Sequence, residues 1–278
     1  LCKNQKVEII EDLLNNMDKF DVNMNVVDIN EMTPLHHAAI SCFDETIVKL
    51  LLNTNKCDIN AKDNKGRTAL HYACEKGKKS IIEELLKYKE IIDVNIQDKN
   101  KSTPLHEFAK SSHFDNNILE ILLKSKCNPN IADNKGNTPL HFACLKENNL
   151  FVSTLIDLSS FEIDPNIINK KYQTPLCIVC MKNDNLIFNT LFSSKLKTKI
   201  DINLASPIYI AALKGNSFLV EQLLDMPGID VNSNLKNHFD FYSDNENGND
   251  ENEEDDEFEF DFSGLSLLHI LAYSDSND

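Results

Sequence analysis

Histidine and cysteine, the two residue types most suited to metal binding or nucleophilic chemistry, recur in this sequence at regular intervals. Such side chains could hold a metal ion or form a nucleophile and its base. Four histidines stand 35 residues apart, and a fifth stands at the same place in a later copy of the same motif: His36, His71, His106, His141 and His269. A regular array would hold these side chains about one repeat apart. This spacing argues against a single site that gathers them.

One cysteine pair, Cys177-x-x-Cys180, has the spacing of a redox or zinc motif, but the sequence contains no second pair of that kind. The sequence also lacks a Gly-rich phosphate loop, a nucleophile elbow, a zincin motif and a kinase signature. The neighbouring carboxylates Glu83 and Glu84 are typical of a solvated helix face. We therefore predict no catalytic residue, no cofactor and no metal site in these residues.

The histidines belong to an internal repeat that decides the fold. A Thr-Pro-Leu-His-like motif begins at Thr33, Thr68, Thr103 and Thr138, always 35 residues after the previous copy. Weaker copies begin 36, 32 and 60 residues further on, at Thr174, Ser206 and Ser266. Seven units in phase result.

Each unit predicts two helices. Thr or Ser at the motif start suits a helix N-cap, and the Pro that usually follows is tolerated in the first turn. Pairs of mostly small residues come five and six positions after the Thr, as in Ala38-Ala39 and Ala73-Cys74, and would let helices approach closely. A second stretch then carries apolar residues at helical spacing, as in Ile81, Ile82 and Leu85.

Short polar segments connect the units. A link such as Asp58-Ile59-Asn60 follows the second helix, and a segment such as Asp63-Asn64-Lys65-Gly66 comes next. Such segments are typical of hairpin-like turns.

Together these motifs resemble the ankyrin repeat family, over about residues 6–273. The resemblance implies an all-α ankyrin-repeat solenoid, in which helix-turn-helix units carry β-turn fingers and contact only their neighbours. It predicts a partial N-terminal repeat and link at 1–29, repeats at 30–231, a finger with an acidic, disordered insertion at 232–263, and a truncated last repeat at 264–278. The start at Leu1 and the end at Asp278 suggest a piece of a longer protein.

Two units depart from the pattern. In the first five, the link Asn precedes the motif Thr by eight residues, but Asn203 precedes Ser206 by only three. The sixth finger is therefore essentially deleted. Asn232 precedes Ser266 by 34 residues, which predicts an insertion of 34 − 8 = 26 residues in the seventh finger.

In the family, the motif His forms hydrogen bonds between neighbouring units. The resemblance gives this structural role to the five motif histidines, while Cys74, Cys144 and Cys180 occupy the small-residue position and are expected to be reduced core thiols. The link asparagines stand where ankyrin repeats can be hydroxylated, but a role in capping the turn is the stronger expectation.

The charge is unevenly distributed. The net charge is −16, yet residues 240–261 contain twelve Asp or Glu and no Lys or Arg, which leaves 32 acidic against 28 basic residues elsewhere. No apolar stretch approaches the length of a membrane span, and no signal peptide opens the sequence. We expect a cytoplasmic monomer that does not contact a membrane.

The resemblance implies that a partner docks on the concave face, through finger positions four, three and one before the motif Thr and helix positions seven and eight after it. In the second to fifth units these twenty positions hold ten basic residues and one acidic residue. The basic ones are Lys65, Arg67, Lys76, Lys99, Lys110, Lys135, Lys146, Lys170, Lys171 and Lys182. Either the lysines simply solvate an exposed face, or they bind an acidic segment of a partner protein.

The acidic insertion could itself compete for this surface, through an intramolecular contact of residues 239–262, or it could only keep the protein soluble. The sequence argues against nucleic acid as a partner, because it contains a single Arg and few aromatic residues on that face. The main prediction is a non-enzymatic protein-interaction module or scaffold. The alternatives are the regulatory or targeting part of a larger signalling enzyme, such as a kinase or small-GTPase regulator, and a microbial effector.

Overall fold

The computed structural model describes residues 2–16, 22–41, 45–232 and 266–269, and every regular element of that part is an α-helix. The all-α repeat fold predicted from the sequence is confirmed. The acidic insertion lies outside the described residues. The contact of residues 239–262 therefore stays a prediction, and so do the segment boundaries at 29, 231 and 263.

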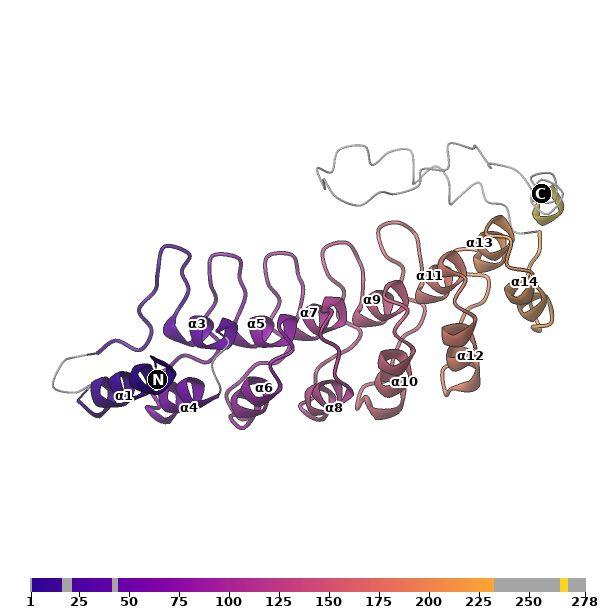
Figure 1. Cartoon of the computed structure of the whole chain (residues 1–278). Helices are drawn as coiled ribbons and strands as arrows, with labels where there is room; N and C mark the ends of the chain where they lie inside the picture. The colour runs from indigo at the N-terminus through magenta and orange to yellow at the C-terminus, as the bar shows by residue number, and fades with distance from the viewer. Residues whose placement is uncertain (1, 17–21, 42–44, 233–265, 270–278) are drawn as a thin grey trace. The chain divides into compact units, whose positions relative to one another are not determined.

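The chain forms two compact units, residues 1–134 with 154–163, and residues 135–153 with 164–278. The first contains α1 (Cys2–Asn15), α3 (Pro34–Ile40), α4 (Thr46–Asn53), α5 (Ala69–Glu75), α6 (Lys79–Leu86), α7 (Pro104–Lys110) and α8 (Asn116–Lys124). Within it, the inner helices α3, α5 and α7 lie side by side in one row, and the outer helices α4, α6 and α8 form a second row (Figure 1).

The second unit repeats this arrangement. It contains α9 (Pro139–Leu145), α11 (Pro175–Lys182), α12 (Asn185–Ser193), α13 (Pro207–Leu213) and α14 (Ser217–Leu224), and α10 (Asn149–Leu158) begins in it. Here α9, α11 and α13 are the inner helices (Figure 1). A hairpin loop precedes most inner helices. We call these loops the first to fifth fingers, at residues 25–33, 60–68, 95–103, 130–138 and 166–174.

The motif Thr and His fix the start of each inner helix and join it to the next repeat. The backbone N–H of Thr33 donates to Nδ1 of His36 at 3.0 Å, and Nε2 of His36 contacts the carbonyl of Arg67 at 2.9 Å. A carbonyl can only accept, so Nε2 carries a proton. Nδ1 accepts the Thr33 N–H and carries none, so the ring is neutral. His71 and His141 make equivalent contacts with the carbonyls of Ser102 and Gln173. The predicted structural role is confirmed for these three histidines.

The small-residue pairs lie where the inner helices meet. Ala39, Ala73 and Cys74 have no exposed surface, and neither do Cys144 and Cys180. Small side chains let neighbouring inner helices approach closely, while the outer helices bury larger residues such as Leu85 and Leu122. Burial of this apolar surface is the main stabilising contribution to a repeat.

The link asparagines join consecutive repeats. The amide of Asn60 donates to the carbonyl of Ile91 at 2.6 Å and accepts from the N–H of Asp93 at 2.9 Å. Asn25, Asn95, Asn166 and Asn203 bond the next repeat in the same two ways. Their side chains therefore form hydrogen bonds to the next repeat, which we call asparagine staples, and do not act only within their own turn.

The sixth repeat has no finger, as its short link predicts. Ala205 and Ser206 both have positive φ, which turns the chain directly into α13. The preceding repeat has Cys177 at the position of the motif His, and its thiol donates to the carbonyl of Ala205 at 3.3 Å. A thiol is a weaker donor than an imidazole N–H, so this junction lacks both the finger contact and the histidine staple.

Candidate functional site

The fingers contain turns whose backbone is organised by an Asp or Asn side chain in the middle of the finger. Oδ1 of Asp63 accepts from the N–H groups of Lys65 and Arg67, at 2.9 and 2.8 Å. Asp28, Asp98 and Asn169 hold their own turns in the same way. This pattern confirms the predicted hairpin-like turns and fixes the backbone next to each fingertip.

Backbone hydrogen bonds join neighbouring fingers and set the spacing of the fingertip side chains. In the first unit the N–H of Asn64 donates to the carbonyl of Asn30 at 2.9 Å, and the N–H of Lys99 donates to the carbonyl of Lys65 at 2.9 Å. In the second unit the N–H of Lys170 donates to the carbonyl of Lys135 at 2.8 Å. Candidate lysines of successive fingers are thus held one repeat apart.

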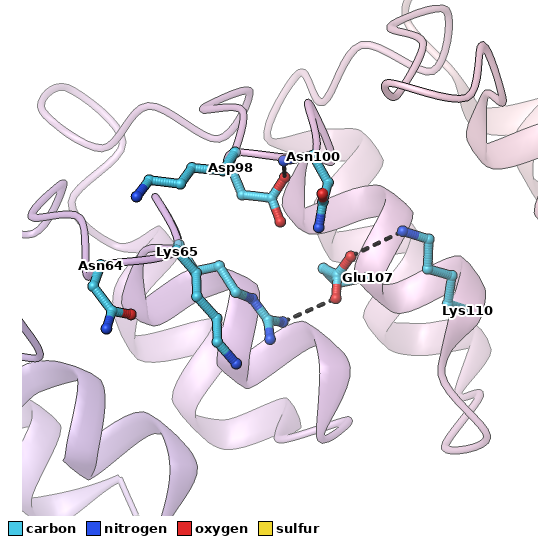
Figure 2. Close-up of a pocket in the computed structure, with 8 residues that line it drawn as sticks. Asn64, Lys65, Asp98, Asn100, Glu107 and Lys110 are labelled. Atoms are coloured by element: carbon cyan, nitrogen blue, oxygen red, sulfur yellow. Dashed lines mark hydrogen bonds and ion pairs between the residues drawn. The ribbon is translucent and has the colours of Figure 1, made fainter. Parts of the chain in front are cut away.

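A polar cleft of about 550 Å³ opens in the first unit between the second and third fingers and the inner helix α7 (Figure 2). Four of the ten candidate residues line it, together with two acidic residues and two asparagines. The lining residues are Asn64, Lys65, Arg67, Asp98, Lys99, Asn100, Glu107 and Lys110. With four cations and two carboxylates, the cleft has an excess of positive charge.

Arg67 is enclosed in an ion-pair network at the base of this cleft. Its guanidinium contacts Oε2 of Glu75 at 2.6 Å and Oε2 of Glu107 at 2.9 Å, and only 11% of its side chain is exposed. Burial disfavours the charged guanidinium, but the attraction of Glu107 and Glu75 outweighs it and raises the pKa of Arg67. Lys110 pairs with Oε1 of Glu107 at 3.1 Å (Figure 2), and Lys76 pairs with Glu75 at 2.6 Å.

Tyr72 ties this network to the second finger. The Arg67 guanidinium lies 4.3 Å from the centre of the Tyr72 ring, and the Tyr72 hydroxyl donates to Oδ2 of Asp63 at 2.5 Å. Burial, together with the hydrogen bond to the Asp63 carboxylate, raises the pKa of Tyr72 to about 12. The base of the cleft is consequently a preorganised set of charged and aromatic groups.

Lys65 and Lys99 differ from the other three candidate cations of the first unit. Both side chains are exposed, both line the cleft, and within the described residues neither has an ion-pair partner. Arg67, Lys76 and Lys110 instead pair with Glu75 and Glu107, which leaves this network with one more cation than carboxylates. The cleft cations that have no ion pair among the described residues are Lys65 and Lys99.

The second unit carries the other five candidate lysines, all of them exposed: Lys135, Lys146, Lys170, Lys171 and Lys182.

The finger position just before the motif Thr is buried instead of exposed. Ser102, Asn137 and Gln173 are almost fully buried there, and the side-chain amide N–H group of Asn169 donates to the side-chain oxygens of Asn137 and Gln173. Arg67 holds the same position in the second finger. Side chains at this position therefore make contacts inside the protein.

Glu107 and Asp98 line the cleft but are not predicted by the sequence pattern. Glu107 lies four residues after its motif Thr, outside the positions that the resemblance assigns to the face, and its partner Arg67 is 40 residues away. The side chain of Asp98 holds its own turn through the N–H groups of Asn100 and Ser102.

The cysteine pair lies in the core. Cys177 and Cys180 have no exposed surface, and burial raises the pKa of both thiols, that of Cys177 to about 11. Protonated, solvent-excluded thiols are poor nucleophiles and poor metal ligands. Cys74 and Cys144 are equally buried, and burial raises their pKa as well. The predicted core role is confirmed for Cys74, Cys144 and Cys180, and Cys177 is buried as well.

Across the described ranges, no group of three or more His, Cys, Asp or Glu side chains is arranged to hold a metal ion. In the same part of the chain, no helix has both the length and the apolar character needed to cross a membrane.

Comparisons with known proteins agree with the geometry. A family model of ankyrin repeats (three copies) matches residues 1–98 and 88–166. Among solved structures, the chain is similar to the ankyrin repeat domain of Bcl-3, described as a unique member of the IkappaB protein family. That match has a TM-score of 0.66 at 20% sequence identity, and covers 81% of this chain and 95% of the other. None of the curated proteins compared with the sequence matches it.

Proposed function

This chain belongs to the ankyrin repeat family, and from that premise we propose that it binds an acidic segment of a partner protein through its lysine-rich fingers and inner helices. Ankyrin repeats are generally non-enzymatic modules that bind other proteins, and they present a rigid extended surface to do so. Proteins that share one fold bind unrelated partners. The partner of this chain is therefore determined by its own surface side chains.

The observation that carries the proposal is the pair of exposed lysines, Lys65 and Lys99, at the cleft of the first unit. Arg67 and Lys110, the other two cations that line the cleft, pair with Glu107. Partner carboxylates would meet uncompensated positive charge there, which speeds association and disfavours basic partners. Lys135, Lys146, Lys170, Lys171 and Lys182 would extend the recognition in the second unit. As the sequence predicts, we also propose that the protein is monomeric and cytoplasmic.

Selection from a random peptide library displayed on phage tests this proposal without knowledge of the partner. The baits are the unmodified chain, Lys65→Glu/Lys99→Glu, and the control Lys49→Glu/Lys89→Glu, which changes the same charge at exposed lysines that do not line the cleft. We expect the unmodified chain and the control to enrich peptides rich in Asp and Glu, and the cleft variant to lose that enrichment. Equal enrichment on all three baits would contradict the proposal.

A further inference from the structure

The cleft of the first unit contains hydrogen-bond donors that the protein itself leaves unused. Asn64 and Lys65 come from the second finger, and Lys99 and Asn100 come from the third. Among the described residues, the ammonium groups of the two lysines and the side-chain amide of Asn64 have no hydrogen-bond or ion-pair partner. The side-chain oxygen of Asn100 accepts from Asn134 at 3.4 Å, which leaves its NH₂ group as a donor. We call Asn64, Lys65, Lys99 and Asn100 the donor set.

The backbone holds the four members of the donor set close together. The N–H of Lys99 donates to the carbonyl of Lys65 at 2.9 Å, so the two lysine side chains begin at adjacent points of a bonded pair of fingers. Asn64 directly precedes Lys65 in the chain, and Asn100 directly follows Lys99. All four residues line the same cleft (Figure 2). A single small ligand group is therefore within reach of donors from both fingers.

The elements that form the cleft are positively charged, even when every carboxylate they carry is counted. The second and third fingers and residues 69–76 and 104–110 contain seven Lys or Arg and four Asp or Glu, a net charge of 7 − 4 = +3. The four carboxylates already accept hydrogen bonds or form ion pairs within the protein: Asp63, Glu75, Asp98 and Glu107. Within the described residues, the buried Nε of Arg67 also lacks a hydrogen-bond partner. The cleft is therefore richer in donors than in acceptors.

We propose that the cleft recognises a phosphorylated side chain, phosphoserine or phosphothreonine, within the acidic segment of the partner protein. This inference rests on the proposed function and names the group that the cleft selects. A phosphoryl group carries about −1.5 to −2 charges at pH 7 and three acceptor oxygens, whereas a carboxylate carries one charge and two oxygens. The cleft is lined by two more cations than carboxylates, so one phosphoryl group balances its charge and one carboxylate does not. The three oxygens can also accept charge-assisted hydrogen bonds from both fingers.

Two neighbouring carboxylates of the partner would carry the same charge as one phosphoryl group, but they fit the donor set less well. Like charges held close together repel each other, whereas the donors of both fingers surround a single cleft. The cleft volume of about 550 Å³ lies within the range of about 300–1,000 Å³ that is typical of ligand pockets, so a group larger than a carboxylate can enter. Binding would therefore respond to phosphorylation of the partner.

Three fluorescent peptide libraries test the proposal on the full chain. Their flanking positions are randomised, and they differ only at two central positions, which hold phosphoserine-Ala, Glu-Glu or Ser-Ala. The Glu-Glu library matches the charge of the phosphoserine library, so the comparison separates the phosphoryl group from negative charge alone. The amount of each library that the immobilised protein retains is the measured quantity.

Two variants remove different parts of the donor set. The first removes its charge, and the second removes its amides at constant charge: Lys65→Gln/Lys99→Gln and Asn64→Ala/Asn100→Ala. Each has a matched control that changes two exposed residues of the same type outside the cleft: Lys49→Gln/Lys89→Gln and Asn30→Ala/Asn134→Ala. Circular dichroism should give every variant the melting temperature of the unmodified chain, because none of the changed side chains is buried.

We expect the unmodified chain and both controls to retain at least tenfold more of the phosphoserine library than of the Glu-Glu library, and least of the Ser-Ala library. Lys65→Gln/Lys99→Gln should lose the retention of both anionic libraries. Asn64→Ala/Asn100→Ala keeps the charge of the cleft, so it should still retain the Glu-Glu library but lose the preference for phosphoserine.

Three results would overturn the proposal. The first is equal retention of the phosphoserine and Glu-Glu libraries by the unmodified chain. The second is equal retention of the phosphoserine library by the lysine variant and its control, which would place the phosphate outside the cleft. The third is binding of inorganic phosphate without retention of the phosphoserine library, which would assign the cleft to a small phosphate ligand.

Failure of this inference and failure of the proposed function give different results. If the two anionic libraries are retained equally and both are lost in Lys65→Gln/Lys99→Gln, the cleft binds an acidic segment without selecting phosphate. If the unmodified chain retains none of the libraries, both proposals are contradicted.

Discussion

At the scale of single residues, the motif histidines couple the stability of the array to pH. His36, His71 and His141 each accept a backbone N–H at Nδ1 and donate from Nε2 to the next repeat, as His141 does at 3.1 and 3.2 Å. A second proton at Nδ1 would break the first bond and place a charge in the core. Burial accordingly lowers the pKa of His36 and His71, and that of His141 to about 4.

We therefore predict that the free energy of unfolding falls as the pH decreases from about 6.5 to about 4. An unfolded His titrates near 6.5, so in this range the unfolded chain binds protons that the folded chain does not. A shift from 6.5 to about 4 corresponds to roughly 3 kcal/mol for His141. Urea unfolding at pH 7.5, 6.5, 5.5 and 4.5 measures this, and constant stability down to pH 5 would contradict it.

At the scale of elements, the fingertips demand particular backbone conformations. Gly136 has φ +79°, and a Cβ there would lie 2.8 Å from Cα of Asn169 in the next finger. Gly215 also has positive φ, at +66°, but no atom lies within 4 Å of where its Cβ would be. These two glycines separate the effect of backbone strain from the effect of finger packing.

Gly136→Ala should destabilise the protein more than Gly215→Ala does. Both substitutions place Ala in the left-handed region, which costs about 1–2 kcal/mol. Only the first also forces two fingers apart, which we expect to add about 1 kcal/mol or more. Thermal unfolding of the two variants measures the difference. Equal melting temperatures would show that the fingers are not packed as described.

Much of the fold could be predicted from the sequence, because turns and caps depend on nearby residues. Thr-Pro at the helix start and Asp-x-x-Gly in the fingers are local patterns, and the structure follows them. The cleft could not be predicted. The direction of Arg67 depends on Glu75, and on Glu107, which comes from the next repeat. Spacing within one repeat cannot show that its charge is already compensated.

At the scale of the whole molecule, the repeats differ in how strongly they are joined. Most junctions combine a finger contact, a histidine contact and an asparagine staple. The junction before α13 keeps the staple of Asn166 but has only the Cys177 thiol in place of the histidine, and the sixth repeat has no finger. Since repeat arrays are stabilised by nearest-neighbour contacts, a weak junction marks a place where they separate first.

We predict that α13 and α14 open before α11 and α12 do. Native-state hydrogen exchange measured by mass spectrometry reports this opening directly. Backbone amides of α13 should exchange at least tenfold faster than those of α11. Equal protection of both helices would mean that the finger and the histidine add little to the junction.

The central prediction for this molecule is that Lys65 and Lys99 recruit an acidic partner protein. Affinity purification from native cytosol tests it most directly, with the unmodified chain, Lys65→Glu/Lys99→Glu and Lys49→Glu/Lys89→Glu as baits and bound proteins quantified by mass spectrometry. We predict proteins that the first and third baits retain and the second loses, with Asp- and Glu-rich segments among them. Retention of the same proteins by all three baits would contradict the claim.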